Sequence, residues 1–167
     1  SYIGGAIGDL AGAAANPVTT VSGLTVTSPS VTVNKNSVNN SCLGATFGRI
    51  NTYSAVTSTS VSNPSLTYNA TDSPNFTLNL GSFAGYVTGN AIQEVATTDI
   101  TITGDAKVVL GTGSSNLSNI RAGLVGYANA NVRMENWTVE NTEVQVKGNL
   151  TTATSYIGGV VGYVYTN

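Results

Sequence analysis

Histidine is absent from this sequence, and charged side chains are scarce. Its 167 residues include six Lys and Arg and eight Asp and Glu, so only 8% of the chain is charged, against roughly 25% in typical soluble domains. Without histidine, the chain has neither a Ser–His or Cys–His nucleophile pair nor a histidine-based metal site. The few acidic residues lack the spacing of a calcium loop. We therefore predict that the protein is not an enzyme, with no catalytic residue, no metal site and no cofactor.

Cysteine is nearly absent as well. Cys42 is the only one, so no disulfide can form within the chain. We expect it to be a small buried side chain, with a link to another chain as the alternative.

The sequence also lacks the patterns typical of nucleic-acid-binding proteins and of membrane-spanning proteins. No cluster of basic residues points to nucleic acid as a partner, and no apolar stretch approaches the ~20 residues needed for a membrane span. The polar, weakly charged composition favours an extracellular or cell-surface location.

What the sequence does contain is a repeated glycine motif. Five segments share the order apolar, small, small, apolar or Thr, apolar, Gly, any residue, apolar; they are residues 3–10, 43–50, 80–87, 121–128 and 157–164. In the fourth segment, Arg121 breaks the first apolar position. The closing glycines are Gly8, Gly48, Gly85, Gly126 and Gly162, which lie 36 to 41 residues apart. This spacing falls within the range of solenoid repeats.

Short stretches of alternating apolar and polar residues follow the glycine motifs. Pairs of such stretches occupy residues 24–26 and 31–33, 100–102 and 108–110, and 137–139 and 144–146. The second copy is the weakest, with Val61, Leu66 and Tyr68 as its apolar residues, and Pro29 and Pro64 mark matching turns. Period-two alternation is typical of half-buried strands.

The two patterns together predict an all-β fold. We expect one repetitive domain, a right-handed parallel β-helix or related β-solenoid of about four imperfect ~38-residue repeats. The repeats would cover residues 1–38, 39–75, 76–116 and 117–153, with a partial repeat at 154–167. A β-sandwich is the alternative; it would explain the strand spacing but not the repeated glycines.

The glycine motif resembles the GLUG repeat, named for Gly-Leu-any-Gly, of large bacterial surface proteins and adhesins. Gly123-Leu124-Val125-Gly126 is a literal match, and residues 159–162 and 5–8 are near matches. The copies at residues 45–48 and 82–85 lack the first glycine. The resemblance implies a surface-exposed repetitive scaffold without an active site.

Stacking of the repeats would turn each motif position into a column. The position after the closing glycine holds Asp9, Arg49, Tyr86, Tyr127 and Tyr163. Asp9 and Arg49 would form an ion pair, and the three tyrosines an aromatic ladder. Such a ladder either binds sugar rings or only stabilises neighbouring turns.

The strand that carries the motif is apolar or small on both faces. Ile3 and Ile7 would lie on one face, and Ala6 and Leu10 on the other. A strand of this kind is usually covered on both sides. We expect the cover to come from long loops of this chain, with another chain as the alternative.

Six Asn-x-Ser/Thr sequences are candidate N-glycosylation sites. They begin at Asn39, Asn69, Asn75, Asn116, Asn136 and Asn149. In a chain this rich in Asn, Ser and Thr, about five would arise by chance, so they show only that glycosylation is chemically available in a eukaryotic secretory pathway.

Two functions remain open. The chain is either a structural repeat segment of an extracellular filament, surface layer or adhesin stalk, or an adhesion module that binds glycans or another surface. Residues 1–5, Ser-Tyr-Ile-Gly-Gly, recur as residues 155–159, so the sequence returns to its own first repeat. We expect either continuation in a longer array or self-association, end to end or laterally.

Overall fold

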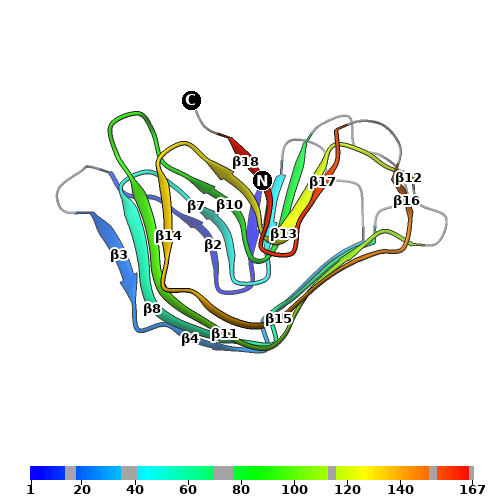
Figure 1. Cartoon of the computed structure of the whole chain (residues 1–167), viewed down its shortest axis with the longest axis horizontal. Helices are drawn as coiled ribbons and strands as arrows, with labels where there is room; N and C mark the ends of the chain where they lie inside the picture. The colour runs from blue at the N-terminus through cyan, green and yellow to red at the C-terminus, as the bar shows by residue number, and fades with distance from the viewer. Residues whose placement is uncertain (14–17, 35–40, 70–76, 113–115, 151–153, 166–167) are drawn as a thin grey trace.

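The structure is a computed structural model and describes residues 1–13, 18–34, 41–69, 77–112, 116–150 and 154–165. These residues form a β-solenoid of about four turns (Figure 1). Within the described ranges, strands pair only in parallel and no helix occurs; accordingly, no helix there is long and apolar enough to cross a membrane. The all-β solenoid prediction is confirmed, and the antiparallel pairing of a β-sandwich is not found in the described strands.

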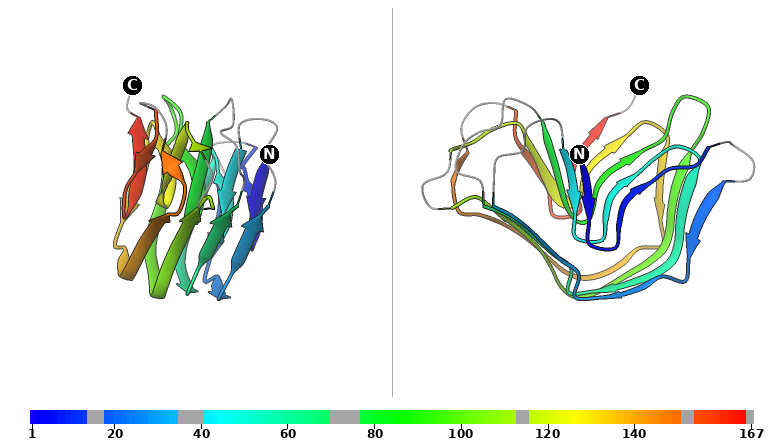
Figure 2. Two further views of the ribbon diagram at one scale, coloured as in Figure 1. Left: turned by 90° about the vertical axis from the view of Figure 1, so that its right-hand side faces the viewer. Right: turned by 180° about the vertical axis from the view of Figure 1, so that it is seen from behind.

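One sheet, here called the glycine sheet, contains all five glycine motifs. Its strands are β1 (Tyr2–Gly4), β2 (Ile7–Leu10), β6 (Ser41–Gly44), β7 (Phe47–Ile50), β10 (Leu78–Thr88), β13 (Ile120–Asn129), β17 (Tyr156–Ile157) and β18 (Val161–Tyr165). The sheet has five layers, in the order β1, β6, β10, β13, β17. Figure 2 shows these layers side by side from the N-terminal to the C-terminal end.

A second sheet, here called the outer sheet, curves around the glycine sheet (Figure 1). Its strands are β3 (Thr19–Ser22), β4 (Thr25–Thr27), β5 (Ser30–Val33), β8 (Ser54–Ser62), β9 (Ser65–Tyr68), β11 (Val95–Leu110), β14 (Val132–Glu135) and β15 (Thr138–Val146). A small third pair joins β12 (Asn116–Leu117) to β16 (Asn149–Leu150). Among the described residues, the outer sheet therefore has four layers where the glycine sheet has five.

The glycine motifs stack in register, as predicted. Ile7 lies opposite Phe47, Phe47 opposite Ala84, Ala84 opposite Val125, and Val125 opposite Val161. Each of these residues immediately precedes a closing glycine, so the five closing glycines form one column through the molecule.

The hydrophobic core fills the space between the two sheets. In one half, Phe47 and Phe83 of the glycine sheet pack with their ring centroids 5.2 Å apart and belong to the same buried cluster as Val61 and Ile102 of the outer sheet. In the other half, Leu43, Leu80 and Leu110 belong to a second buried cluster. Strand β8 alternates between buried and partly exposed residues along most of its length, which is why its sequence reads as period two.

Sharp corners in the outer sheet come from residues with positive φ. Gly23, Ser58, Asp99 and Asn136 occupy equivalent places in the four turns, with φ of 69°, 50°, 55° and 54°. Glycine, Asn and Asp tolerate this left-handed conformation best. The corner lets each turn change direction without a long loop.

The sequence interpretation misplaced Arg121 by one residue. The structure puts Ala122 opposite Leu80 and Arg121 opposite Asn79. The register then shifts between Gly81 and Ala84, because the fourth copy has one residue fewer in the bend. Arg121 therefore does not interrupt the apolar column, which Ala122 occupies.

The outer sheet also contains strand segments that the sequence interpretation missed. The segment Thr19–Ser22 of β3 pairs with the start of β8, which pairs with the start of β11, and β11 in turn pairs with β14. These segments add one strand position to the glycine strand and the two alternating stretches that were predicted for each repeat.

Candidate functional site

The glycine motif folds each strand of the glycine sheet back on itself. A Cβ added at Gly4 would overlap the carbonyl oxygen of Ile7 in the same turn. One added at Gly126 would lie 2.5 Å from the nitrogen of Leu80, in the preceding turn. The bend divides each glycine strand into a first limb, such as β1 or β6, and a second limb, such as β2 or β7. The backbones of the two limbs thus touch each other. This close approach brings backbone of the same chain against the glycines on the second face of the strand.

Beyond the glycines, side chains from the two limbs face each other across a narrow cavity of about 310 Å³, here called the tyrosine groove. Its lining residues are Tyr2, Cys42, Thr77, Asn79, Tyr86, Arg121 and Tyr127. Tyr2, Cys42, Asn79 and Arg121 form one column on the first limb, which Tyr156 continues. The groove therefore runs along the axis of the solenoid.

The predicted tyrosine ladder exists on the second limb. The rings of Tyr86 and Tyr127 are stacked with centroids 4.9 Å apart and planes only 5° apart. Tyr127 and Tyr163 follow at 5.5 Å with a tilt of 35°. Asn129 links two of the hydroxyls: the Tyr127 hydroxyl donates to Asn129 Oδ1, and Asn129 Nδ2 donates to the Tyr86 hydroxyl. Partial burial raises the pKa of the Tyr127 phenol above its ordinary value.

The predicted ion pair also exists. Arg49 Nε and Nη2 bond the two carboxylate oxygens of Asp9 at 2.8 and 2.6 Å. The same guanidinium lies 3.8 Å from the ring centroid of Tyr2 and donates to its hydroxyl. A bidentate pair of this kind fixes its geometry better than a lysine would.

A second cation crosses the groove further along. The guanidinium carbon of Arg121 lies 4.0 Å from the centroid of Tyr127 and 4.5 Å from that of Tyr163. The ring of Tyr163 also contacts Tyr156, at 4.5 Å. Rings from the two adjacent turns and the guanidinium of Arg121 thus occupy both faces of Tyr127, which leaves neither face open to a sugar ring.

Cys42 and Asn79 line the groove on the first limb. Cys42 is 5% exposed, and burial raises the pKa of its thiol. Asn79 Nδ2 lies 3.5 Å from the sulfur. Cys42 therefore conforms to the expectation of a small buried residue.

The chemistry available in the groove is limited. Among the described residues, no three His, Cys, Asp or Glu side chains come together in a way that could hold a metal. The raised pKa of the Cys42 thiol is the opposite of what a nucleophile requires. What the groove does is tie successive turns together, through ring stacking, cation–ring contacts and hydrogen bonds.

The six glycosylation candidates are dispersed. Asn136 is exposed, and its amide donates to Asp99 at 3.0 Å. Asn69 donates to Asn34, and Asn149 is exposed. Asn116 begins β12. The two others, Asn39 and Asn75, lie outside the described residues.

Several groove residues escaped the sequence interpretation. Tyr2, Asn79 and Tyr156 belong to a column in which Cys42 and Arg121 also stand, and this mixture of four residue types gives no composition signal along the column. They share a position two residues before a glycine, namely Gly4, Gly81 and Gly158, and this shared position could have revealed them. In the fourth copy, the one-residue deletion hid this rule for Arg121.

The chain was compared with known proteins in three ways. Neither a scan against family models, nor a search of curated proteins, nor a search of solved structures found a match to this chain.

Proposed function

We propose that this chain is a structural segment of an extracellular filament, surface layer or adhesin stalk, in which further β-solenoid layers cover both of its end faces. A single column carries the proposal. Ile3 and Ile157, at the two ends, are 42% and 38% exposed, whereas Leu43, Leu80 and Ala122 between them are at most 1% exposed. One and the same position is core inside the molecule and surface at both ends.

The two end faces expose apolar side chains of the kind that the core buries. Tyr2 is 43% exposed at one end, and Val160 and Val164 are 50% and 58% exposed at the other. Full burial of such an apolar side chain is worth about 1.5–3 kcal/mol. The end strands also present backbone groups that can pair with another strand. Covering these faces is therefore strongly favourable.

The rest of the molecule supports a scaffold role. The site built by the glycine motif holds turns together and leaves no open ring face on Tyr127, as described above. The low charge, the repeats and the resemblance to GLUG surface proteins support an extracellular or cell-surface location.

A glycan-binding adhesion module is the second candidate. One observation favours it: within the described part of the chain, Tyr86 has a ring contact on one face only, and it lines the 310 Å³ groove. A sugar ring stacked there would be the ligand. Binding of an oligosaccharide that is lost in Tyr86→Ala, with unchanged melting temperature, would establish this function.

Light scattering on the purified chain tests the main proposal. We expect the particle mass to rise with concentration through tens of micromolar. Ile157→Lys places a charge on the C-terminal end face and should abolish this rise. Ile92→Lys is the matched control, because Ile92 is 88% exposed in the connection between β10 and β11, away from both ends. A monomer of constant mass would contradict the proposal.

A further inference from the structure

Large side chains cross the tyrosine groove at two places and leave it open between them. Arg49 crosses it with its guanidinium 3.8 Å from a tyrosine ring of the opposite limb, and Arg121 crosses it 4.0 Å from another. Between these crossings the first limb carries Cys42 and Asn79, which have short side chains. The cavity of about 310 Å³ lies there. Its volume is near the lower limit of the roughly 300–1,000 Å³ typical of small-molecule sites.

Arg121 brings an unpaired positive charge to this cavity. Arg49 is neutralised by its bidentate pair with Asp9, whereas no carboxylate pairs with Arg121 in the part of the chain that the structure describes. The Nε of Arg121 is buried and has no hydrogen-bond partner among those residues. The groove therefore holds a net positive charge in a chain whose net charge is -2. A carboxylate is the anion whose planar pair of oxygens best matches a guanidinium.

Asn79 contributes an acceptor that the fold does not use. The residue is 7% exposed, and its Oδ1 has no hydrogen-bond partner among the described residues. A buried acceptor without a partner destabilises a fold, and a hydroxyl group of a ligand would satisfy it. Asn79 lies opposite Arg121 in the next layer, about 4.8 Å away along the axis. One small ligand can therefore bond both side chains.

Tyr86 contributes an open ring face. In the ladder it lies between Arg49 and Tyr127, and Tyr127 stacks on one face. The guanidinium of Arg49 turns instead to the ring of Tyr2, so no described ring or cation contacts the other face of Tyr86. This open face is on the side of the layer that contains Cys42, which lines the cavity as well. An aromatic face of this kind suits the C–H face of a sugar ring.

We propose that the tyrosine groove binds a carboxylated sugar, such as a unit of an acidic polysaccharide. This inference rests on the glycan-binding candidate above and names its class of ligand. The carboxylate bonds Arg121, a ring hydroxyl donates to Asn79 Oδ1, and the sugar ring lies on Tyr86. A neutral sugar would leave the charge of Arg121 unpaired, and a small carboxylate would leave Tyr86 uncovered. The three features together therefore select an acidic sugar.

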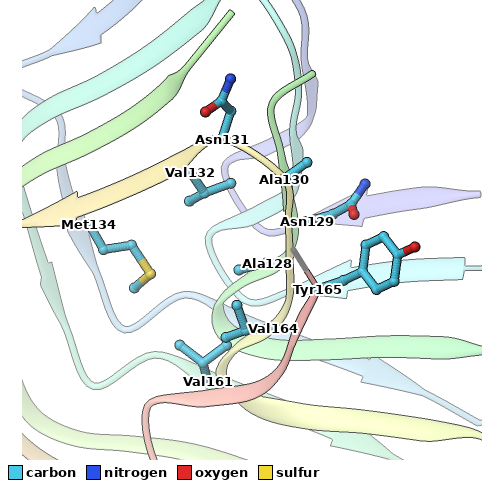
Figure 3. A pocket seen from close by; sticks show the side chains of 9 residues that line it. All are labelled: Ala128, Asn129, Ala130, Asn131, Val132, Met134, Val161, Val164 and Tyr165. Atoms are coloured by element: carbon cyan, nitrogen blue, oxygen red, sulfur yellow. The ribbon is translucent and has the colours of Figure 1, made fainter. Parts of the chain in front are cut away.

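A larger cavity lacks these features. Its volume is about 500 Å³, it lies between β13, β14 and β18, and apolar side chains such as Val132, Met134 and Val161 line it (Figure 3). No charged residue is among the described residues around it. It offers nothing that would hold a carboxylate, so the ligand is assigned to the tyrosine groove.

Isothermal titration calorimetry of the full chain tests the proposal with two matched pairs of probes, trigalacturonate with galactotriose and sialyllactose with lactose. We expect an acidic sugar to bind about tenfold or more tightly than its neutral counterpart, and its affinity to fall as salt is added. Arg121→Gln should weaken binding of the acidic sugar by about tenfold or more. Arg133→Gln is the matched control, because Arg133 pairs with Glu94 and Glu135 on the outer sheet, and it should bind as the wild type does.

Asn79→Leu separates binding from stability. Leucine has a similar size and removes the unpaired oxygen, so we expect a melting temperature at or above that of the wild type. Affinity for the acidic sugar should nevertheless fall by about fivefold or more. If Asn79→Leu binds as the wild type does, the groove is not the site.

The probes also separate this inference from the function on which it rests. If a neutral sugar binds as tightly as its acidic counterpart, the choice of an acidic sugar is wrong but the glycan-binding candidate stands. If neither pair of probes binds, both are wrong.

Discussion

At the scale of single residues, the closing glycines are fixed by the backbone that passes them. A Cβ on Gly126 would lie 2.5 Å from the nitrogen of Leu80 and 2.7 Å from the oxygen of Gly85, and neither backbone atom can rotate away. Gly126 does not adopt a positive φ, so lack of space, rather than backbone strain, excludes a side chain.

Replacing this glycine should therefore be costly. We predict that Gly126→Ala lowers the free energy of unfolding by more than about 2 kcal/mol, through overpacking that two backbones must absorb. Chemical denaturation measures the change.

Gly159→Ala is the control for that measurement, because a Cβ at Gly159 meets only the Thr142 side chain, at 3.4 Å. Its expected cost is under about 0.5 kcal/mol. Equal costs in the two variants would show that the contact between the limbs does not explain the motif.

Cys42 gives a prediction for alkaline pH. Burial raises the pKa of its thiol, so the folded chain holds the proton after the unfolded chain has released it. The resulting stability is complete below pH 9.0, the ordinary pKa of the group, and is lost as the pH rises through the folded pKa. We predict that the unfolding free energy of the wild type falls more steeply above pH 9.0 than that of Cys42→Ala. Parallel curves for the two proteins would contradict this.

At the scale of elements, the tyrosine groove joins the turns of the glycine sheet. Tyr127 contacts a ring on one side, and a ring and a guanidinium on the other. Each contact of this kind contributes roughly 0.5–1.5 kcal/mol. The groove thus adds to the strand pairing a set of side-chain links that repeat with the layers.

We predict that Tyr127→Ala lowers the unfolding free energy by about 2 kcal/mol or more, as two ring contacts and one cation–ring contact are lost. Tyr127→Phe keeps the ring and loses the hydroxyl with its hydrogen bond to Asn129, so it should cost about 1 kcal/mol or less. Thermal and denaturant unfolding test both. If Tyr127→Ala is as stable as the wild type, the ladder does not hold the turns together.

The elements also show what sequence reasoning could reach. The glycine spacing and the alternating stretches sufficed to predict parallel layers, and the column of Tyr86, Tyr127 and Tyr163 followed from that register. The bend in the glycine strand could not be predicted in the same way. A tight backbone contact requires only small residues, and small residues do not reveal which segment they lie against. The opposite wall of the groove was missed for a related reason: Cys42, Asn79 and Arg121 share a position but no chemistry.

At the scale of the whole molecule, stability should decline from the middle layers toward the ends. Leu80 and Phe83 have a layer on either side and are fully buried, whereas Ile3 and Ile157 are exposed on one side. In a repeat protein, each layer is stabilised by its two neighbours, so an end layer has half the support of an inner one.

Hydrogen exchange of the dilute chain should show this gradient. We predict that amides of β1, β2, β17 and β18 exchange by local opening much faster than those of β10 and β13. Raising the protein concentration should slow exchange at the end layers if copies cover one another. Uniform protection at every layer, independent of concentration, would contradict the picture of open ends.

The central claim is that the turns continue from copy to copy along one axis, and fibre diffraction from aligned, assembled protein tests it most directly. Strands that lie across the axis and stack along it predict a strong reflection near 4.8 Å on the meridian. Orientation decides the matter, because lateral association would place that spacing at an angle to the fibre. A meridional 4.8 Å reflection is the result expected here; its absence from the meridian, or a chain that stays monomeric at tens of micromolar, would contradict the account.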